Sequence, residues 1–176
     1  MQDRHGTRAL ADRLRDRSRD HFNAGDYDFI AARDMFFLAT ADAEGKPSCS
    51  YKGGDPGFVR VVESDKLQWH DYDGNGMFKS LGNTLVNEWV GLLFIDFLAQ
   101  ERLRVEGRAS ISGDVGDLTV TVAVERIYPN CPRYIHQLKL VERSKYVPRD
   151  EAPPPEPAWK SADWARDVLP PTATTT

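Results

Sequence analysis

The spacing of apolar residues along the chain changes near residue 35. Over 7–33, Leu10, Leu14 and Phe22 recur at helix-like intervals among charged residues, which predicts helical structure. The stretch "NAGDYD" is interpreted as a Gly turn that interrupts this region, with a helix cap at Asp26. After residue 35, short apolar runs are separated by Gly, Pro and Asp, which is typical of strands joined by turns.

This second region predicts a series of strands with a single helix among them. A hairpin comes first, in which residues 35–41 and "SCSYK" are joined by the turn "DAEGKP". The further strands are expected over 58–62, 66–71, 90–97, 102–111 and 118–128, and the helix over about 76–87. Six or seven short strands with few helices favour a mainly β fold, a small closed or nearly closed antiparallel barrel.

Two of these strands differ in their polarity. The strand over 102–111 alternates, with apolar residues such as Leu103 and Val105 on one face and charged residues such as Arg104 and Glu106 on the other. "VGLLFIDF" is apolar on both faces, which predicts a strand that is covered on both sides.

Composition and length narrow the classes of protein that fit. A chain of 176 residues suits one main core, with a helical segment at 1–34, a barrel domain at 35–148 and a Pro-rich linker and tail at 149–176. In this tail, Trp159 and Trp164 predict docking onto the barrel, a second subunit or another protein.

Charge, hydropathy and cysteine usage argue against several partners. A net charge of −4 offers no general attraction for nucleic acid, and no apolar run approaches the roughly 20 residues that cross a bilayer. The N-terminus lacks the apolar core of a signal peptide, so we expect a cytoplasmic protein without a membrane partner. Cys49 and Cys131 are too few for a disulfide framework or a four-ligand zinc site.

The stretch "WHDYDGNGMFKSLGN" begins like a calcium-binding loop, with Asp71, Asp73, Asn75 and Gly76 at the required spacing. Its twelfth position is Gly82, however, where such a loop needs a bidentate Glu. The preceding "KLQWH" also has the pattern of a strand and not of an entering helix. Calcium is therefore disfavoured, and no metal site is expected.

The same stretch fits an anion-binding turn. A strand that ends near His70 would lead through a turn to a helix that starts near Gly76, with Asn75 as its cap. The unpaired N–H groups and the positive dipole end of a helix N-terminus favour an anion.

Side chains near this helix start would complete the site. Lys79 and Ser80 lie in its first turn, Asn83 follows one turn later, and Arg60 on a strand offers a second cation. The alternative is that Asn75 is only a cap, and that Lys79 and Arg60 are ordinary surface residues.

Taken together, "MFFLATADAEGKPSCSYKGGDPGFVRVV", "DYDGNGMFKSLGN" and "VGLLFIDF…RLRVEGRASI" resemble the pyridoxamine 5'-phosphate oxidase-like family of flavin-binding split barrels. The likeness covers about residues 30–146. It implies a six-stranded antiparallel split barrel that forms a homodimer, with FMN bound in a groove at the dimer interface.

The resemblance also implies roles for individual residues. It assigns the FMN phosphate to Arg60, Lys79 and Ser80, with Asn83 nearby. The isoalloxazine ring and ribityl chain would lie along Ser50, Tyr51, Lys52, Asp71, Tyr72 and Asn75. The segment "NCPRYIH" would reach the partner's flavin through Cys131, Arg133 and Tyr134, and Arg133, Tyr134 and His136 are candidate substrate contacts. The alternative for this segment is a strand end followed by a Pro turn.

One departure from the family limits the activity that the resemblance implies. The Trp-Gln-Gly and Arg-Leu-His stretches that grip the substrate in the true oxidase are absent from "QLKLVERSKYVPRD", so oxidation of pyridoxamine phosphate is not expected. The leading hypothesis is an FMN-dependent oxidoreductase that takes electrons from a nicotinamide donor or another small molecule. The alternative is a sensor or carrier that binds flavin, deazaflavin or haem without turnover.

Overall fold

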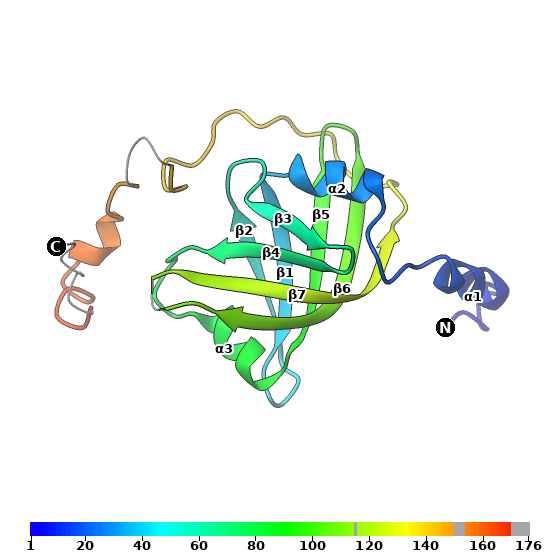
Figure 1. Cartoon of the computed structure of the whole chain (residues 1–176), viewed down its shortest axis with the longest axis horizontal. Coiled ribbons are helices and arrows are strands. Elements are labelled where there is room, and N and C mark those ends of the chain that lie inside the picture. Colours follow the sequence, from blue (N-terminus) through cyan, green and yellow to red (C-terminus); the bar gives the residue numbers. More distant parts are fainter. Residues whose placement is uncertain (115, 150–153, 170–176) are drawn as a thin grey trace. The chain divides into compact units, whose positions relative to one another are not determined.

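The computed structural model describes residues 1–114, 116–149 and 154–169. The chain divides into two compact units, Met1–Lys139 and Leu140–Thr176. The first unit contains an antiparallel sheet of seven strands with short helices around it (Figure 1). A mainly β fold is thus confirmed, with one strand more than the six that the family resemblance implies.

The strands follow the predicted series closely. Their bounds are β1 Met35–Ala41, β2 Pro47–Gly53, β3 Val59–Glu63, β4 Lys66–Asp71, β5 Trp89–Asp96, β6 Glu101–Ser112 and β7 Leu118–Pro129. They pair in the order β2-β1-β5-β6-β7-β4-β3, with every neighbouring pair antiparallel. The first and third strands of the chain are therefore far apart in the sheet, although a short sequence separates them.

The core shows that this sheet curls. The ring of Phe36 on β1 lies 5.1 Å from the ring of Trp69 on β4 and 5.2 Å from the ring of Phe94 on β5, measured between centroids. β1 and β4 are four places apart in the strand order, so a flat sheet would separate these side chains. Because they touch, the two ends of the sheet must face each other across one core, as in a split barrel.

The two strands that differed in polarity also differ in the structure. On β6 the predicted alternation is confirmed, since Leu103 and Val105 are buried and Arg104 is exposed. On β5, Leu92 and Phe94 on the inner face are buried, but Leu93 on the outer face is only half-buried. The outer face of β5 is therefore only partly covered within the first unit, whereas the inner face is buried as predicted.

The predicted helical region 7–33 forms two helices, α1 Arg8–Asp16 and α2 Ala24–Ala31. No residue of α1 is buried, so its apolar periodicity does not reflect packing onto the barrel. The expected Gly turn at "NAGDYD" is wrong, because this stretch opens α2. The N-cap is Asn23, whose side chain accepts a hydrogen bond from the Asp26 N–H, while the Asp26 carboxylate accepts one from the Asn23 N–H. Asp26 is thus the third residue of a capping box and not the cap itself.

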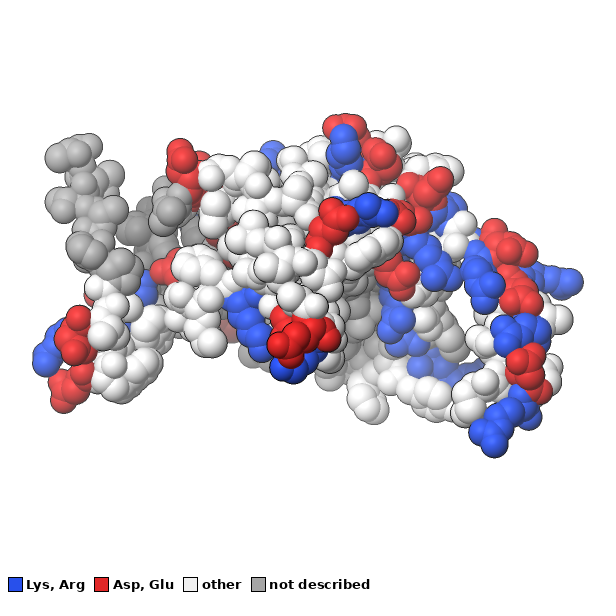
Figure 2. Space-filling model, turned by 90° about the horizontal axis from the view of Figure 1, so that it is seen from below, with Lys and Arg blue, Asp and Glu red and all other residues white. Residues whose placement is uncertain are grey.

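Charged side chains of both signs are interspersed over the face drawn in Figure 2. Ion pairs elsewhere on the described surface include Arg108 of β6 with Glu125 of β7 and with Glu88, which precedes β5. Among the described residues on this face, no large area carries one sign of charge, and such an area is what would attract a polyanion.

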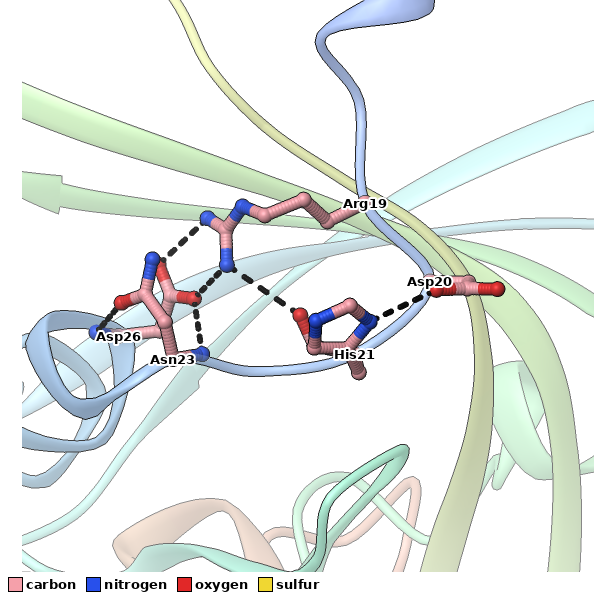
Figure 3. Close-up of polar contacts among 5 residues, drawn as sticks. All are labelled: Arg19, Asp20, His21, Asn23 and Asp26. Atoms are coloured by element: carbon pink, nitrogen blue, oxygen red, sulfur yellow. Dashed lines mark hydrogen bonds and ion pairs between the residues drawn. The ribbon is translucent and has the colours of Figure 1, made fainter.

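The segment before α2 is fastened to the barrel by Arg19 (Figure 3). Its backbone N–H donates to the Ile127 carbonyl at 2.9 Å, and the Ile127 N–H donates back at 2.6 Å. Its guanidinium forms two hydrogen bonds to the Asp26 carboxylate and a third, at 3.2 Å, to the His21 carbonyl. The Asp26 side chain is 8% exposed, so this ion pair is partly shielded from water and links β7 to the start of α2.

The second unit is small in its described part. It contains one turn of 3₁₀ helix, η1 Ala158–Ser161, and the rings of Trp159 and Trp164 stack with centroids 6.0 Å apart. Docking of this pair stays a prediction, as do the domain bounds 1–34, 35–148 and 149–176. The predicted linker lies partly, and the final residues 171–176 wholly, outside the described residues. No helix within the described ranges is long and apolar enough to span a membrane.

Asp26→Ala should lower the free energy of unfolding by about 2 to 4 kcal/mol, because it leaves the Arg19 guanidinium without its carboxylate and removes half of the capping box. Urea unfolding measures this loss. Asp28→Ala, an exposed carboxylate on the same helix, is the matched control and should change stability little. Equal losses in the two variants would contradict the assigned role of the Arg19–Asp26 pair.

Candidate functional site

A groove of about 440 Å³ opens on the first unit where the ends of the curled sheet approach each other. It is lined by residues 48–52 of β2, by 71–72 at the end of β4 and by 74–81, which lead into α3 (Lys79–Val86). Its volume lies within the usual range for small-molecule and cofactor sites.

Two side-chain contacts join elements on opposite sides of this groove. These elements are not connected by backbone hydrogen bonds of the sheet. The Lys52 ammonium donates to the Asp71 carboxylate at 2.5 Å, which links β2 to β4. The hydroxyls of Ser50 and Ser80 lie 3.0 Å apart and link β2 to α3. The Lys52 side chain is 20% exposed and that of Asp71 only 5%, so this ion pair lies deep in the groove wall.

The helix at the groove begins later than the sequence predicts. It starts at Lys79 and not near Gly76, because Gly76 and Phe78 both adopt left-handed backbone conformations that interrupt helical structure. Asn75 is therefore not the helix cap; its side chain accepts a hydrogen bond from the Met77 N–H at 3.1 Å within the loop. The predicted capping role of Asn75 is wrong.

This late start leaves the N-terminus of α3 without a side-chain cap. Phe78 occupies the N-cap position with φ 47° and forms no capping hydrogen bond, although a bulky residue in this conformation costs roughly 1–2 kcal/mol. The first N–H groups of an α-helix have no intrahelical partner. Since residues 78–81 line the groove, an anion in the groove would meet these N–H groups and the positive end of the helix dipole.

The charges around the groove divide into a paired and an unpaired set. Lys52 and Asp71 neutralise each other. Lys79 is exposed at the first position of α3, and no ion pair is recorded for it within the described ranges. Lys79 is thus the lining cation whose charge is available to an anion.

Two phenols lie beside the groove, Tyr72 in its wall and Tyr51 on the outer face of β2 against the Phe37 ring. Partial desolvation, together with the negative charge of Asp34, raises the pKa of Tyr51, and desolvation with the charge of Asp55 raises the pKa of Tyr72. Both hydroxyls therefore stay protonated at neutral pH and can donate hydrogen bonds to a ligand.

The family model described as pyridoxamine 5'-phosphate oxidase matches residues 27–152, well over half of the chain. The chain belongs to this family. No curated protein matches the sequence significantly. The match covers the barrel and the groove, so the resemblance drawn from the motifs is confirmed.

Solved structures agree with the fold of this pyridoxamine 5'-phosphate oxidase family member. A single-residue variant of HupZ from Group A Streptococcus has a TM-score of 0.50 at 21% identity, over 61% of this chain and 98% of that one. A putative pyridoxamine 5'-phosphate oxidase from Lactobacillus delbrueckii has a TM-score of 0.51 at 18% identity, over 62% and 95%. At these identities the likeness shows the shared fold alone.

The groove brings together most of the residues that the sequence singled out. Those that line it are Ser50, Tyr51, Lys52, Asp71, Tyr72, Asn75, Lys79 and Ser80. Sequence reasoning missed Met77 and Phe78, which also line it. Two adjacent apolar residues in an otherwise polar loop were the available signal.

Six predicted residues do not line the groove, among them His136 on the exposed segment after β7. Arg60 is exposed on β3, opposite Gln68 of β4. Cys131, Arg133 and Tyr134 lie on the exposed segment after β7, where the Cys131 sulfur accepts a hydrogen bond from the Arg133 N–H. Asn83 is buried, and its amide donates to the Thr40 hydroxyl at 2.9 Å. The structure thus gives Asn83 a local role in joining α3 to β1, while ligand binding by these six residues stays a prediction.

Asn83→Ala should lower the free energy of unfolding by about 1 to 3 kcal/mol, because it leaves the buried Thr40 hydroxyl without its donor. Urea unfolding of Asn83→Ala, Thr40→Val and the double variant measures how strongly the two side chains are coupled. The double variant should lose less stability than the two single losses together. Strict additivity would contradict a direct bond between α3 and β1.

Proposed function

We propose that the groove binds FMN and that the protein is an FMN-dependent oxidoreductase acting on a small molecule. The observation that carries this proposal is the uncapped start of α3, which presents N–H groups to a groove of cofactor size with Lys79 and Ser80 beside them. Membership of the pyridoxamine 5'-phosphate oxidase family supports the same ligand.

The phosphate of FMN fits the α3 end of the groove. The helix N-terminus supplies N–H donors and a positive dipole end, the Ser80 hydroxyl adds a donor, and Lys79 adds a full charge without a competing carboxylate. Arg60 is the proposed second cation. Its position on the exposed β3 means that it would reach the phosphate from the strand side.

The ring of the flavin fits the part of the groove between β2 and the end of β4. Lys52 offers N–H donors there, and the protonated Tyr72 hydroxyl offers another; Tyr51, on the outer face of β2, would reach the flavin from the dimer interface. Bound flavin supplies hydride chemistry by itself, so no side-chain nucleophile is needed. The protein's part is to bind the phosphate, orient the ring and leave one face open to a substrate or a nicotinamide donor.

A homodimer is the proposed assembly. The outer faces of β1, β2 and β5 carry apolar side chains that pair across the strands, with Phe37 beside Tyr51 and Leu93. None of these three is buried in the single chain, and Trp89 at the start of β5 is 47% exposed. A second copy packed on this face would bury them, and would bring its own Cys131, Arg133 and Tyr134 towards the flavin, with His136 as a further substrate contact.

Pyridoxamine phosphate is not the proposed substrate, because the segment after β7 lacks the substrate-gripping stretches of the true oxidase. The proposed location is the cytoplasm. The second candidate function is binding of flavin, deazaflavin or haem without turnover. One observation favours flavin over haem within this candidate: among the described residues that line the groove there is no histidine, which is the proximal haem ligand of globins and peroxidases.

The visible spectrum of the purified protein tests both functions. We expect bound FMN that absorbs blue light and that is bleached anaerobically by a nicotinamide donor. Flavin that no donor reduces would favour the binding protein, and a Soret band would favour haem. A protein that retains none of these and does not bind added FMN would contradict the proposal.

Lys79→Ala should weaken FMN binding roughly tenfold to a hundredfold, because a charge-assisted contact contributes about 1.5 to 3 kcal/mol. Arg60→Ala should weaken it further in the double variant. Fluorescence titration with FMN and with riboflavin, which lacks the phosphate, measures the effect. Binding of riboflavin should change little.

The matched control for these variants is Lys46→Ala, which removes a lysine that pairs with Glu44 and does not line the groove. It should leave FMN affinity unchanged. If the Lys79→Ala/Arg60→Ala variant bound FMN as tightly as the unmodified protein, the phosphate assignment would be wrong.

A further inference from the structure

The Lys52–Asp71 ion pair lies in the groove wall, away from the N-terminus of α3 where the phosphate is proposed to bind. Ser50 and Lys52 both line the groove and are two residues apart on β2, which corresponds to about 7 Å along a strand. The Ser50 hydroxyl meets Ser80 in the first turn of α3. A ligand that is held by its phosphate at α3 and runs along β2 therefore extends towards the Lys52–Asp71 pair.

The pair is arranged so that its two charges act on a ligand unequally. An ammonium group has three N–H donors, and the Asp71 bond uses one of them, so Lys52 has two more to offer. Asp71 is the more deeply buried partner, at 5% exposure against 20% for Lys52. In such a shielded place, charges interact more strongly with a ligand than they do in water.

We propose that Lys52 and Asp71 together set the reduction potential of the bound flavin, with Lys52 raising it and Asp71 lowering it. This inference rests on the proposed FMN site. A hydride donor gives the oxidised flavin two electrons and one proton, so the ring gains one net negative charge. Lys52 stabilises that charge, and Asp71 opposes it while fixing the position of the Lys52 ammonium.

Two substitutions separate this electrostatic role from a structural one. Lys52→Met removes the positive charge and should lower the midpoint potential, whereas Asp71→Asn removes the negative charge and should raise it. Both substitutions break the same ion pair. A purely structural role would therefore move the potential in the same direction in both variants, and only an electrostatic role moves it in opposite directions.

The measurement is anaerobic titration of the FMN-loaded protein with dithionite in the presence of a reference dye. We expect Lys52→Met to weaken binding of reduced FMN at least tenfold more than binding of oxidised FMN, which for a two-electron couple corresponds to a fall of about 30 mV. Lys52→Arg keeps the charge and should restore most of the potential. Where a variant binds FMN weakly, the dissociation constants for oxidised and reduced FMN give the same shift.

The matched control is the exposed Lys66–Glu63 pair, which lies outside the groove. Lys66→Met and Glu63→Gln should leave the potential unchanged. The inference would be overturned if Lys52→Met and Asp71→Asn shifted the potential in the same direction, or if neither shifted it. It would also be overturned if these variants lost FMN binding in both oxidation states. In each case the FMN site itself stands. If the unmodified protein does not bind FMN, it is the proposed function that fails.

Discussion

The groove exists because side chains, and not a backbone ladder, close the barrel. The seven strands form one continuous sheet that begins at β2 and ends at β3, and aromatic contacts in the core bring its two ends together. Within the described strands, β2 and β4 do not pair with each other, and no other strand fills the gap between them. The gap between them is bridged by the Lys52–Asp71 ion pair and the Ser50–Ser80 contact, which also form the groove wall.

An open sheet end of this kind is normally a liability, because unpaired backbone groups invite pairing with other chains. Here the strand β2 turns its polar side chains towards the gap, and the loop before α3 covers part of it. The same features that protect the gap provide hydrogen-bond donors for a ligand. The left-handed Phe78 fits this account, since its conformation delays the start of α3 and so brings uncapped N–H groups to the groove.

How far the sequence predicted this structure depended on the kind of interaction involved. The strands were predictable because apolar alternation reports directly which face is buried, as on β6. Helix starts were less so: caps were expected at Asp26 and Asn75, and the backbone conformation makes neither of them an N-cap. Asn23 is extended and caps α2, whereas Asn75 precedes the left-handed Gly76 and caps nothing. Contacts between distant elements were beyond any local pattern: the hydrogen bond from the Asn83 amide to the Thr40 hydroxyl, 43 residues earlier, leaves no signal in the sequence around either residue.

The mismatch on β5 carries information of its own. Its sequence is apolar on both faces, and the first unit buries the inner face but leaves the outer face partly exposed. Apolar residues on an outer strand face are typical of a surface that a second subunit covers. The half-buried Leu93 and its neighbour Phe37 lie on the face where the proposed second subunit would pack. In the proposed homodimer, a second copy of the chain would supply the layer that the sequence of β5 predicts.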